Sequence, residues 1–150
     1  MPLNSLNTEY QERVLPSLAT YAALLVIPGS LFLVFLPFGE DVALVSVLIS
    51  TAALLIASHA FSPKILLTDQ HLQVGRASIP RNLLGQAEAI RGSEVFAARG
   101  RDLSPLAYST FQSGIKDIVR VELRDENDPT PYWVFSSRNA EILAARINKI

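Results

Sequence analysis

Residues 14–36 (VLPSLATYAALLVIPGSLFLVFL) and residues 42–61 (VALVSVLISTAALLIASHAF) are the two apolar runs that decide the fold of this 150-residue chain. A short acidic link, PFGED, joins them, and no Lys or Arg lies between Arg13 and Lys64. A helix rises about 1.5 Å per residue, so each run is long enough to cross a hydrocarbon core of about 30 Å. The pattern predicts a transmembrane helical hairpin.

The charges that flank the hairpin predict its orientation. Arg13 precedes the first run, and Lys64, Arg76 and Arg81 follow the second, whereas the link carries only negative charge. Cytoplasmic segments next to membrane spans are enriched in Lys and Arg. We therefore expect a multi-pass protein of the plasma (inner) membrane with its N-terminus and its C-terminal domain in the cytoplasm. The first run lacks a basic leader and a small-x-small cleavage pattern, so we expect a retained anchor instead of a signal peptide.

These features divide the chain into three expected parts. Residues 1–13 are polar and show no hydrophobic periodicity, which predicts a short cytoplasmic tail, frayed at its end. Residues 14–61 form the hairpin, with a kink expected near Pro28 because proline removes one helical hydrogen bond. Residues 62–150 are enough for one small cytoplasmic domain with its own core.

Small residues recur along the second run at spacings of three and four. They fall on one stripe of a helix: Ala43, Ser46, Ser50, Ala53, Ala57 and Ala60. Helices associate in lipid where small side chains allow their backbones to approach closely. Two interpretations stay open at this point. The stripe packs on the first helix of the hairpin, or it docks laterally on another integral membrane protein or a second copy of the chain.

The hydrophobic pattern changes after residue 62. Short alternating segments predict about seven strands, at residues 64–68, 71–74, 76–79, 87–91, 108–111, 117–124 and 132–136. Ser93 begins a predicted helical turn that stops at Gly100. A final helix is expected over residues 138–149, with Ile142, Leu143, Ile147 and Ile150 on one face. The fold class is thus an α-helical membrane hairpin followed by an α+β domain.

Three stretches of the chain carry a resemblance to known proteins. The segment ILLTDQHLQVGRASIP, with about seven strands closed by a C-terminal helix, resembles a pleckstrin-homology-like antiparallel barrel. LQVGRASIPRNLLGQAEAI and VRVELRDENDPTPYWVFSSRN, together with the hairpin, resemble an uncharacterised family of small actinobacterial integral membrane proteins, known as a domain of unknown function. The resemblance implies a topology and a lineage but no activity.

Residues suited to catalysis or metal binding are scarce. The chain has no cysteine, and its two histidines, His59 and His71, have no second ligand at metal-binding spacing. No G-x-S-x-G elbow and no glycine-rich phosphate loop is present. We expect a non-enzymatic protein with no catalytic, cofactor-binding or metal site and no small-molecule substrate. A net charge of −1 without a concentrated basic face argues against nucleic acid as a partner.

Candidate binding residues gather around the irregular stretch between the fourth and fifth expected strands. The cations are Arg91, Arg99, Arg101 and Lys116, which would contact lipid headgroups or an acidic protein face. A solvated loop neutralised by Glu94 and Asp102 is the alternative. Trp133 and Tyr132 are candidate docking anchors, but strand alternation points them in opposite directions, so one of the two should be core.

The expected function follows from these features. The hairpin would dock laterally to a larger membrane complex, such as a respiratory or cell-envelope assembly, and the soluble domain would brace it as an accessory or scaffold subunit. The alternative is a module that binds or senses lipid headgroups at the cytoplasmic leaflet. Membrane lipids are partners in both cases.

Overall fold

The structure is a computed structural model that describes residues 7–149 and separates into two compact units. One unit is Leu15–Ser62, and the other combines the N-terminal segment up to Val14 with Pro63 and everything that follows. The apolar hairpin is therefore an insertion within the sequence of the second unit. Each unit is described by itself below.

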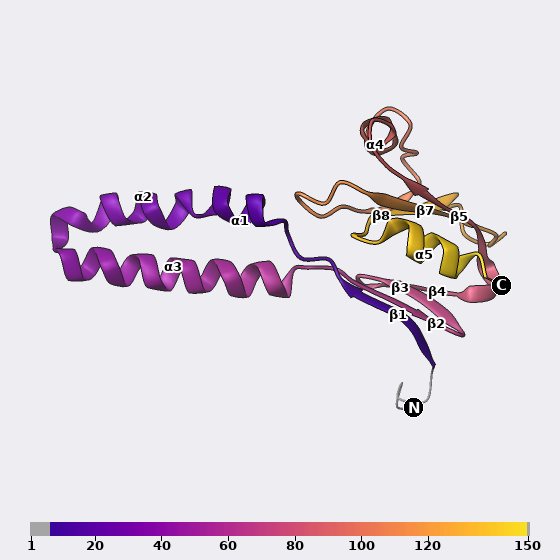
Figure 1. The fold of residues 1–150 in the computed structure, drawn as a ribbon, viewed down its shortest axis with the longest axis horizontal. Coiled ribbons are helices and arrows are strands. Elements are labelled where there is room, and N and C mark those ends of the chain that lie inside the picture. The colour runs from indigo at the N-terminus through magenta and orange to yellow at the C-terminus, as the bar shows by residue number, and fades with distance from the viewer. Residues whose placement is uncertain (1–6, 150) are drawn as a thin grey trace. The chain divides into compact units, whose positions relative to one another are not determined.

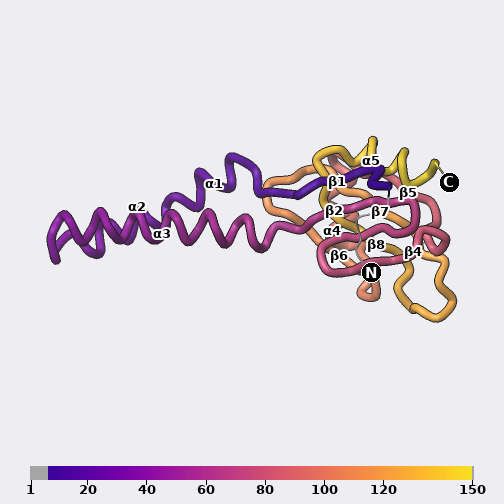
Figure 2. Tube along the Cα trace, turned by 90° about the horizontal axis from the view of Figure 1, so that it is seen from below, coloured from indigo at the N-terminus to yellow at the C-terminus, as the bar shows by residue number. Residues whose placement is uncertain are grey.

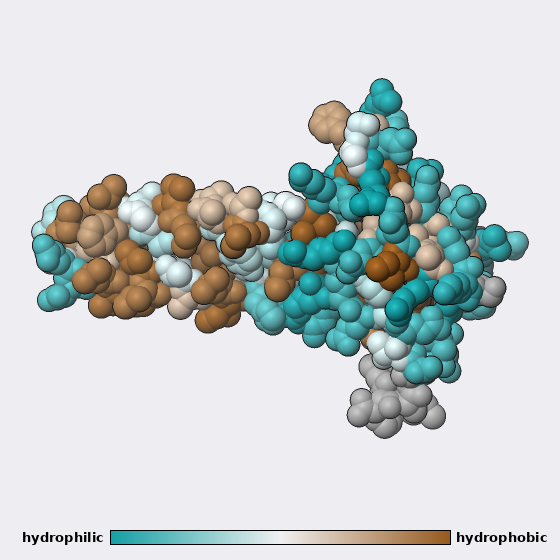
Figure 3. All heavy atoms as spheres, viewed as in Figure 1, coloured by the Kyte–Doolittle hydropathy of each residue, from teal (hydrophilic) through white to brown (hydrophobic). Residues whose placement is uncertain are grey.

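The unit Leu15–Ser62 is a helical hairpin (Figure 1). Its first arm consists of α1 (Leu18–Leu24), α2 (Val26–Phe35) and a 3-10 turn at Leu36–Phe38, and its second arm is α3 (Glu40–Ala60). Both arms are long and apolar enough to cross a membrane. Apolar residues cover most of the visible surface of the hairpin, and polar atoms gather at its tip (Figure 3).

The first arm is interrupted where the sequence predicts a kink. Pro28 has no N–H to donate to the carbonyl of Leu24, and the helix breaks at Leu25, between α1 and α2. Gly39 allows the reversal of the chain because its φ of +122° is one that L side chains rarely adopt. From this turn onward, α2 packs along α3 (Figure 1).

The other unit, described over residues 7–14 and 63–149 and named the soluble unit below, contains two four-stranded sheets. The first has the order β1-β2-β3-β4 and is antiparallel throughout, with β1 at Thr8–Arg13, β2 at Lys64–Thr68, β3 at His71–Val74 and β4 at Ala77–Pro80. The β2–β3 hairpin has the predicted bounds, and the side chains of Leu72 and Val74 point inward and are fully buried.

Strand β1 corrects one expectation. The prediction of an irregular tail is wrong for residues 8–13, which form an edge strand beside β2 (Figure 2). The register pairs Arg13 with Lys64, and Val14 donates its backbone N–H to the carbonyl of Pro63 over 2.9 Å. Residues 1–6 lie outside the described residues. The two ends of the hairpin thus leave the soluble unit from neighbouring positions on paired strands.

Two glutamates fasten β1 to the rest of its unit. The carboxylate of Glu9 forms an ion pair with Arg81 at 2.6 Å. The carboxylate of Glu12 accepts hydrogen bonds from the hydroxyl of Ser137, at 2.7 Å, and from the backbone N–H of Arg138, at 2.8 Å. Arg138 lies just before the final helix, where the helix dipole favours a negative charge. These long-range contacts make β1 part of the domain.

The ion pair of Glu9 predicts a pH-dependent contribution to stability. The hydrogen bond from Arg81 lowers the pKa of Glu9 below its ordinary value. A carboxylate with a lowered pKa stabilises the folded state above its unfolded pKa of about 4.3, and this stabilisation is lost as the pH falls through the folded pKa. We expect Glu9→Gln to lower Tm by several degrees at pH 7, and the difference from wild type to shrink below about pH 4.3.

The matched control for this pH experiment is Glu94→Gln, which changes an exposed acid of the same unit. It should leave Tm unchanged at both pH values. A difference between wild type and Glu9→Gln that persisted undiminished at low pH would show that the ion pair is not its source.

The second sheet has the order β5-β7-β8-β6. Strands β5 (Leu84–Ile90), β7 (Ile118–Leu123) and β8 (Tyr132–Ser136) are antiparallel, whereas β6 (Tyr108–Thr110) pairs with β8 in parallel. The helix α4 (Glu94–Arg99) follows β5 at the predicted position. The predicted closed antiparallel barrel is wrong: the eight described strands form two separate sheets, because no strand pairs across them.

The final helix, α5 (Ala140–Ile147), contacts β5 and β7 of one sheet and β1 of the other. Leu143 and Ile147 are fully buried, but Ile142 is 53% exposed, so the predicted apolar face is only partly right; Ile150 lies outside the described residues. Asn148 binds both backbone groups of Ala87 through its side-chain amide, at 2.8 Å each. The helix therefore closes one core that both sheets share.

Candidate functional site: a basic hollow beside helix α4

The site begins where β5 ends. Gly92, with a φ of +62°, turns the chain from β5 into α4. Val95 anchors the short helix to the second sheet, in a small core with Ile90, Ile118 and Val134. This anchoring fixes the side chains of α4 relative to the connection that enters β7.

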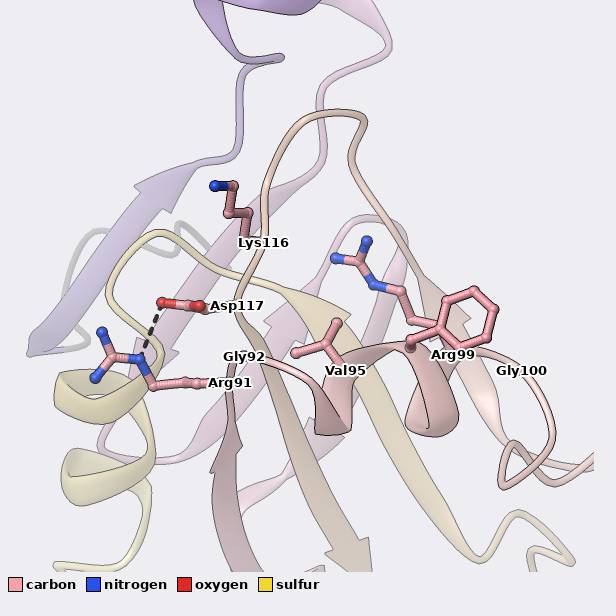
Figure 4. Close-up of a pocket in the computed structure, with 8 residues that line it drawn as sticks. Arg91, Gly92, Val95, Arg99, Gly100, Lys116 and Asp117 are labelled. Carbon is pink, nitrogen blue, oxygen red and sulfur yellow. Dashed lines mark hydrogen bonds and ion pairs between the residues drawn. The ribbon is translucent and has the colours of Figure 1, made fainter.

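A hollow of about 760 Å³ lies between α4 and that connection. Its lining consists of Arg91, Gly92, Val95, Phe96, Arg99, Gly100, Lys116 and Asp117 (Figure 4). Small-molecule sites in proteins have volumes of about 300–1,000 Å³, so the hollow is large enough for a ligand. Of its charged residues, three are cations and one is an acid.

Arg91 is compensated within the fold. Its Nε lies 3.2 Å from a carboxylate oxygen of Asp117, the contact drawn in Figure 4, and its Nη1 forms an ion pair with Glu141 on α5. The hydrogen bond to Glu141 raises the pKa of Arg91 above its ordinary value. The carboxylates of Asp117 and Glu141 therefore neutralise the charge of Arg91.

Arg99 differs from Arg91 because its guanidinium has no carboxylate partner among residues 7–149. Its Nη2 donates to the carbonyl of Ile115, at 2.6 Å, and to the hydroxyl of Ser136, at 3.2 Å. The guanidinium carbon lies 5.1 Å from the centre of the Phe111 ring, at cation–π distance. Its Nε is buried without a hydrogen-bond partner in the described structure, and burial lowers the pKa of the group.

The two remaining predicted cations lie in different places. Lys116 is exposed on the rim of the hollow and forms no ion pair with the described part of the chain. Arg101 is also exposed, but it lies 3.2 Å from Asp102 and lines a neighbouring hollow. The structure thus brings Arg91, Arg99 and Lys116 together and separates Arg101 from them.

Trp133 is the core member of the aromatic pair. It is only 6% exposed and packs against Tyr108, with ring centroids 4.9 Å apart. Tyr132 is half-buried, and its hydroxyl accepts a hydrogen bond from the backbone of Ser104 at 2.7 Å. Because Trp133 is buried, the expectation that it contacts a lipid or a partner is wrong.

The small-residue stripe of α3 is divided in the structure. Ala43 is fully buried, and Ser46 and Ser50 are half-buried, with hydroxyls that donate to carbonyls of their own helix. The other three members, Ala53, Ala57 and Ala60, are exposed. The half of the stripe nearer the turn therefore lies against the first arm. The other half, Ala53, Ala57 and Ala60, is uncovered.

No cluster suited to a metal ion forms in the described structure, where no three His, Asp or Glu side chains gather closely enough. His71 is the exposed first residue of β3, paired with Pro80, and His59 lies near the end of α3. The expectation that the protein is not an enzyme stays a prediction.

A family model described as a protein of unknown function (DUF3093) matches residues 9–147. The chain belongs to the DUF3093 family. The DUF3093 match begins within β1 and ends at the last residue of α5, so it covers the hairpin and the soluble unit together. No curated protein and no solved structure matches this DUF3093 chain.

Sequence reasoning missed two features of the site. The carboxylates that neutralise Arg91 come from Asp117 and from Glu141 on α5, and nothing in the sequence joins them to Arg91. The strand β1 had no hydrophobic signal of its own, because Tyr10 is the only aromatic or apolar residue in Thr8–Arg13.

Proposed function

We propose that this protein is a non-enzymatic accessory or scaffold subunit anchored in the plasma (inner) membrane. Its hairpin docks laterally on a larger integral membrane protein complex, of which respiratory and cell-envelope assemblies are examples, and its soluble domain braces that complex on the cytoplasmic side. The observation that carries the proposal is the pairing of Arg13 with Lys64. Because both ends of the hairpin join paired strands, the domain is tethered at two neighbouring points.

The two-point tether supports the topology as well as the bracing role. Strands β1 and β2 form one ladder, so both ends of a membrane-inserted hairpin must emerge on the same side. Lys and Arg flank the hairpin, and its tip carries Glu40 and Asp41, which favours cytoplasmic ends. An actinobacterial lineage and a relation to pleckstrin-homology-like domains rest on the sequence resemblance alone.

The uncovered half of the α3 stripe supplies the docking face in this proposal. Ala53 and Ala57 are exposed and have small side chains. In lipid, burial of leucine against leucine gains nothing over contact with acyl chains, so close backbone approach at small residues drives association. A helix of the partner complex would pack against this face.

A double substitution tests lateral docking. We expect Ala53→Leu with Ala57→Leu to reduce the amount of assembly that survives gentle solubilisation by about tenfold, or about 1.4 kcal/mol, because the larger side chains prevent close approach of the two backbones. Native mass spectrometry of the complex purified from its own membranes measures the loss. The matched control is Ala52→Leu, which adds the same side chain to another exposed face of α3. A wild-type spectrum with only the monomer overturns the proposal, and one with only a homodimer replaces the partner with a second copy.

Binding of lipid headgroups is the second candidate function. The observation in its favour is that Arg99 and Lys116 line one hollow without a carboxylate partner in the part of the chain that the structure describes. The cytoplasmic leaflet of a membrane is anionic and attracts such side chains. This role and lateral docking use different units of the protein, so they are compatible.

A further inference from the structure

Two of the three cations that line the hollow beside α4 form no ion pair within the described part of the chain. Arg91 is neutralised by Asp117 and by Glu141, which leaves Arg99 and Lys116 as uncompensated cations. In Figure 4, Arg91 and Asp117 face each other at one end of the hollow, and Arg99 lies at the other. Lys116 lies next to Asp117 on the connection that enters β7, and in this view its ammonium group points away from Arg99. An anionic ligand would supply the charge that the fold does not.

Arg99 is held in place before any ligand arrives. Its two hydrogen bonds from Nη2, to Ile115 and Ser136, and its position over the Phe111 ring fix the plane of the guanidinium. The Nε–H is buried without an acceptor, and no acceptor for Nη1 lies in the described structure. Buried donors of native proteins usually have a partner, so the unpartnered Nε–H leaves the charge of Arg99 incompletely compensated by the fold. Nη1 is left as the donor that can meet a phosphate oxygen from outside the chain, since guanidinium groups form strong charge-assisted hydrogen bonds with phosphate.

The rim of the hollow carries a large apolar group. Phe96 on α4 is 89% exposed, although it is an aromatic residue of a folded domain. Exposed Trp, Phe and Leu side chains of proteins that lie on a membrane surface insert into the boundary between headgroups and acyl chains. An exposed ring beside two cations therefore suits a ligand with a phosphate and an apolar part.

We infer that this hollow is a phosphate-binding site, in which Arg99 and Lys116 bind the oxygens of a phosphate monoester or diester and Phe96 contacts the apolar group that carries it. The phosphate belongs either to an anionic phospholipid of the leaflet or to a soluble compound. The lipid source rests on the second candidate function above, and neither source depends on lateral docking. Arg101 and Arg91 are not part of the site, because each is paired with carboxylates.

The test uses the full chain in a neutral detergent, with three probes measured by isothermal titration calorimetry. The probes are inorganic phosphate, dihexanoyl phosphatidylglycerol and zwitterionic dihexanoyl phosphatidylcholine. We expect saturable binding of the phosphatidylglycerol and binding of phosphatidylcholine at least about tenfold weaker, because its ammonium group cancels the charge of its phosphate. Saturable binding of inorganic phosphate as well identifies the phosphate group alone as sufficient and favours a soluble ligand. Binding of phosphatidylglycerol alone identifies the lipid.

Substitutions assign the residues. Lys116→Gln should weaken binding about fivefold, as expected for one exposed cation near an anionic surface, and Arg99→Gln should weaken it at least about tenfold. The matched control, Arg101→Gln, should bind as the wild type does. Phe96→Ser should weaken binding of the lipid but not of inorganic phosphate. Fluorescence of the buried Trp133 reports whether each variant is folded, and the exposed Lys116 keeps the test valid if Arg99→Gln does not fold.

Three results overturn the inference: no saturable binding of either anionic probe, equal binding of phosphatidylcholine and phosphatidylglycerol, or unchanged binding in folded Lys116→Gln. None of these results affects the assembly measured with Ala53→Leu and Ala57→Leu, so failure of the site and failure of lateral docking are distinguishable.

Discussion

A chain that lacks residues 8–13 will unfold at a temperature more than about 10 °C below that of the wild type, or will not fold cooperatively. The deletion removes the ladder partner of β2, the half-buried ring of Tyr10 and the carboxylate that pairs with Arg81. The side chain of Arg81 is only 12% exposed, so loss of Glu9 leaves a largely buried charge without its ion pair. Together these losses amount to several kcal/mol, a large part of the stability of a small domain.

Tm of the wild type and of the deletion variant is measured on the purified proteins in detergent, with the hairpin present in both. Trp133 is the single tryptophan of the sequence and lies in the core of the soluble unit, so its emission follows unfolding of that unit. Gln11→Ser is the matched control, because it changes an exposed side chain of β1 and leaves the backbone ladder intact. An unchanged Tm in the deletion variant would contradict the assignment of β1 to the domain.

Single cysteines at the hairpin tip and in the soluble unit will react on opposite sides of the membrane. The sequence contains no cysteine, so each introduced thiol is the sole site of labelling. We expect Glu40→Cys to react with a membrane-impermeant maleimide in intact cells or in spheroplasts, and Glu94→Cys to react only after lysis. The difference should be nearly complete, because a charged reagent does not cross the hydrocarbon core.

The same two variants after lysis are their own control, because both positions are exposed and both thiols should then be labelled. Reaction of Glu94→Cys before lysis, with Glu40→Cys protected, reverses the proposed orientation. Equal reaction of both variants in intact cells shows that the hairpin does not cross the membrane.

The parts of the fold that follow from local patterns were predictable. Strand alternation and a short turn place β2 and β3 at their observed bounds, and the apolar runs with Pro28 give the hairpin and its break. Strand β1 was not recognised, because its partner β2 lies beyond the whole hairpin in the sequence. The barrel was wrong for a similar reason: closure depends on pairing between sheet edges, and the parallel pairing of β6 with β8 has no local signature.

For the candidate site too, the residue types could be predicted from the sequence, but their pairing in the folded chain could not. The sequence identified the cations, but it could not separate Arg99 from Arg91, since their difference lies in the carboxylates of Asp117 and Glu141. Alternation predicted that one of Tyr132 and Trp133 is buried, and only the packing of Trp133 on Tyr108 decides which. Charge compensation and burial are properties of the folded chain.

The position of the hairpin also determines the order of biogenesis. The residues of β1 leave the ribosome before the hairpin, yet they acquire their neighbour only after the whole hairpin and β2 have been synthesised. Their contacts with Ser137 and Arg138 must wait until those residues have been synthesised. If the hairpin enters the bilayer as proposed, the sheet of β1 is completed only after the hairpin has been synthesised, and a nascent chain that stalls at insertion would expose an incomplete sheet to cellular proteases.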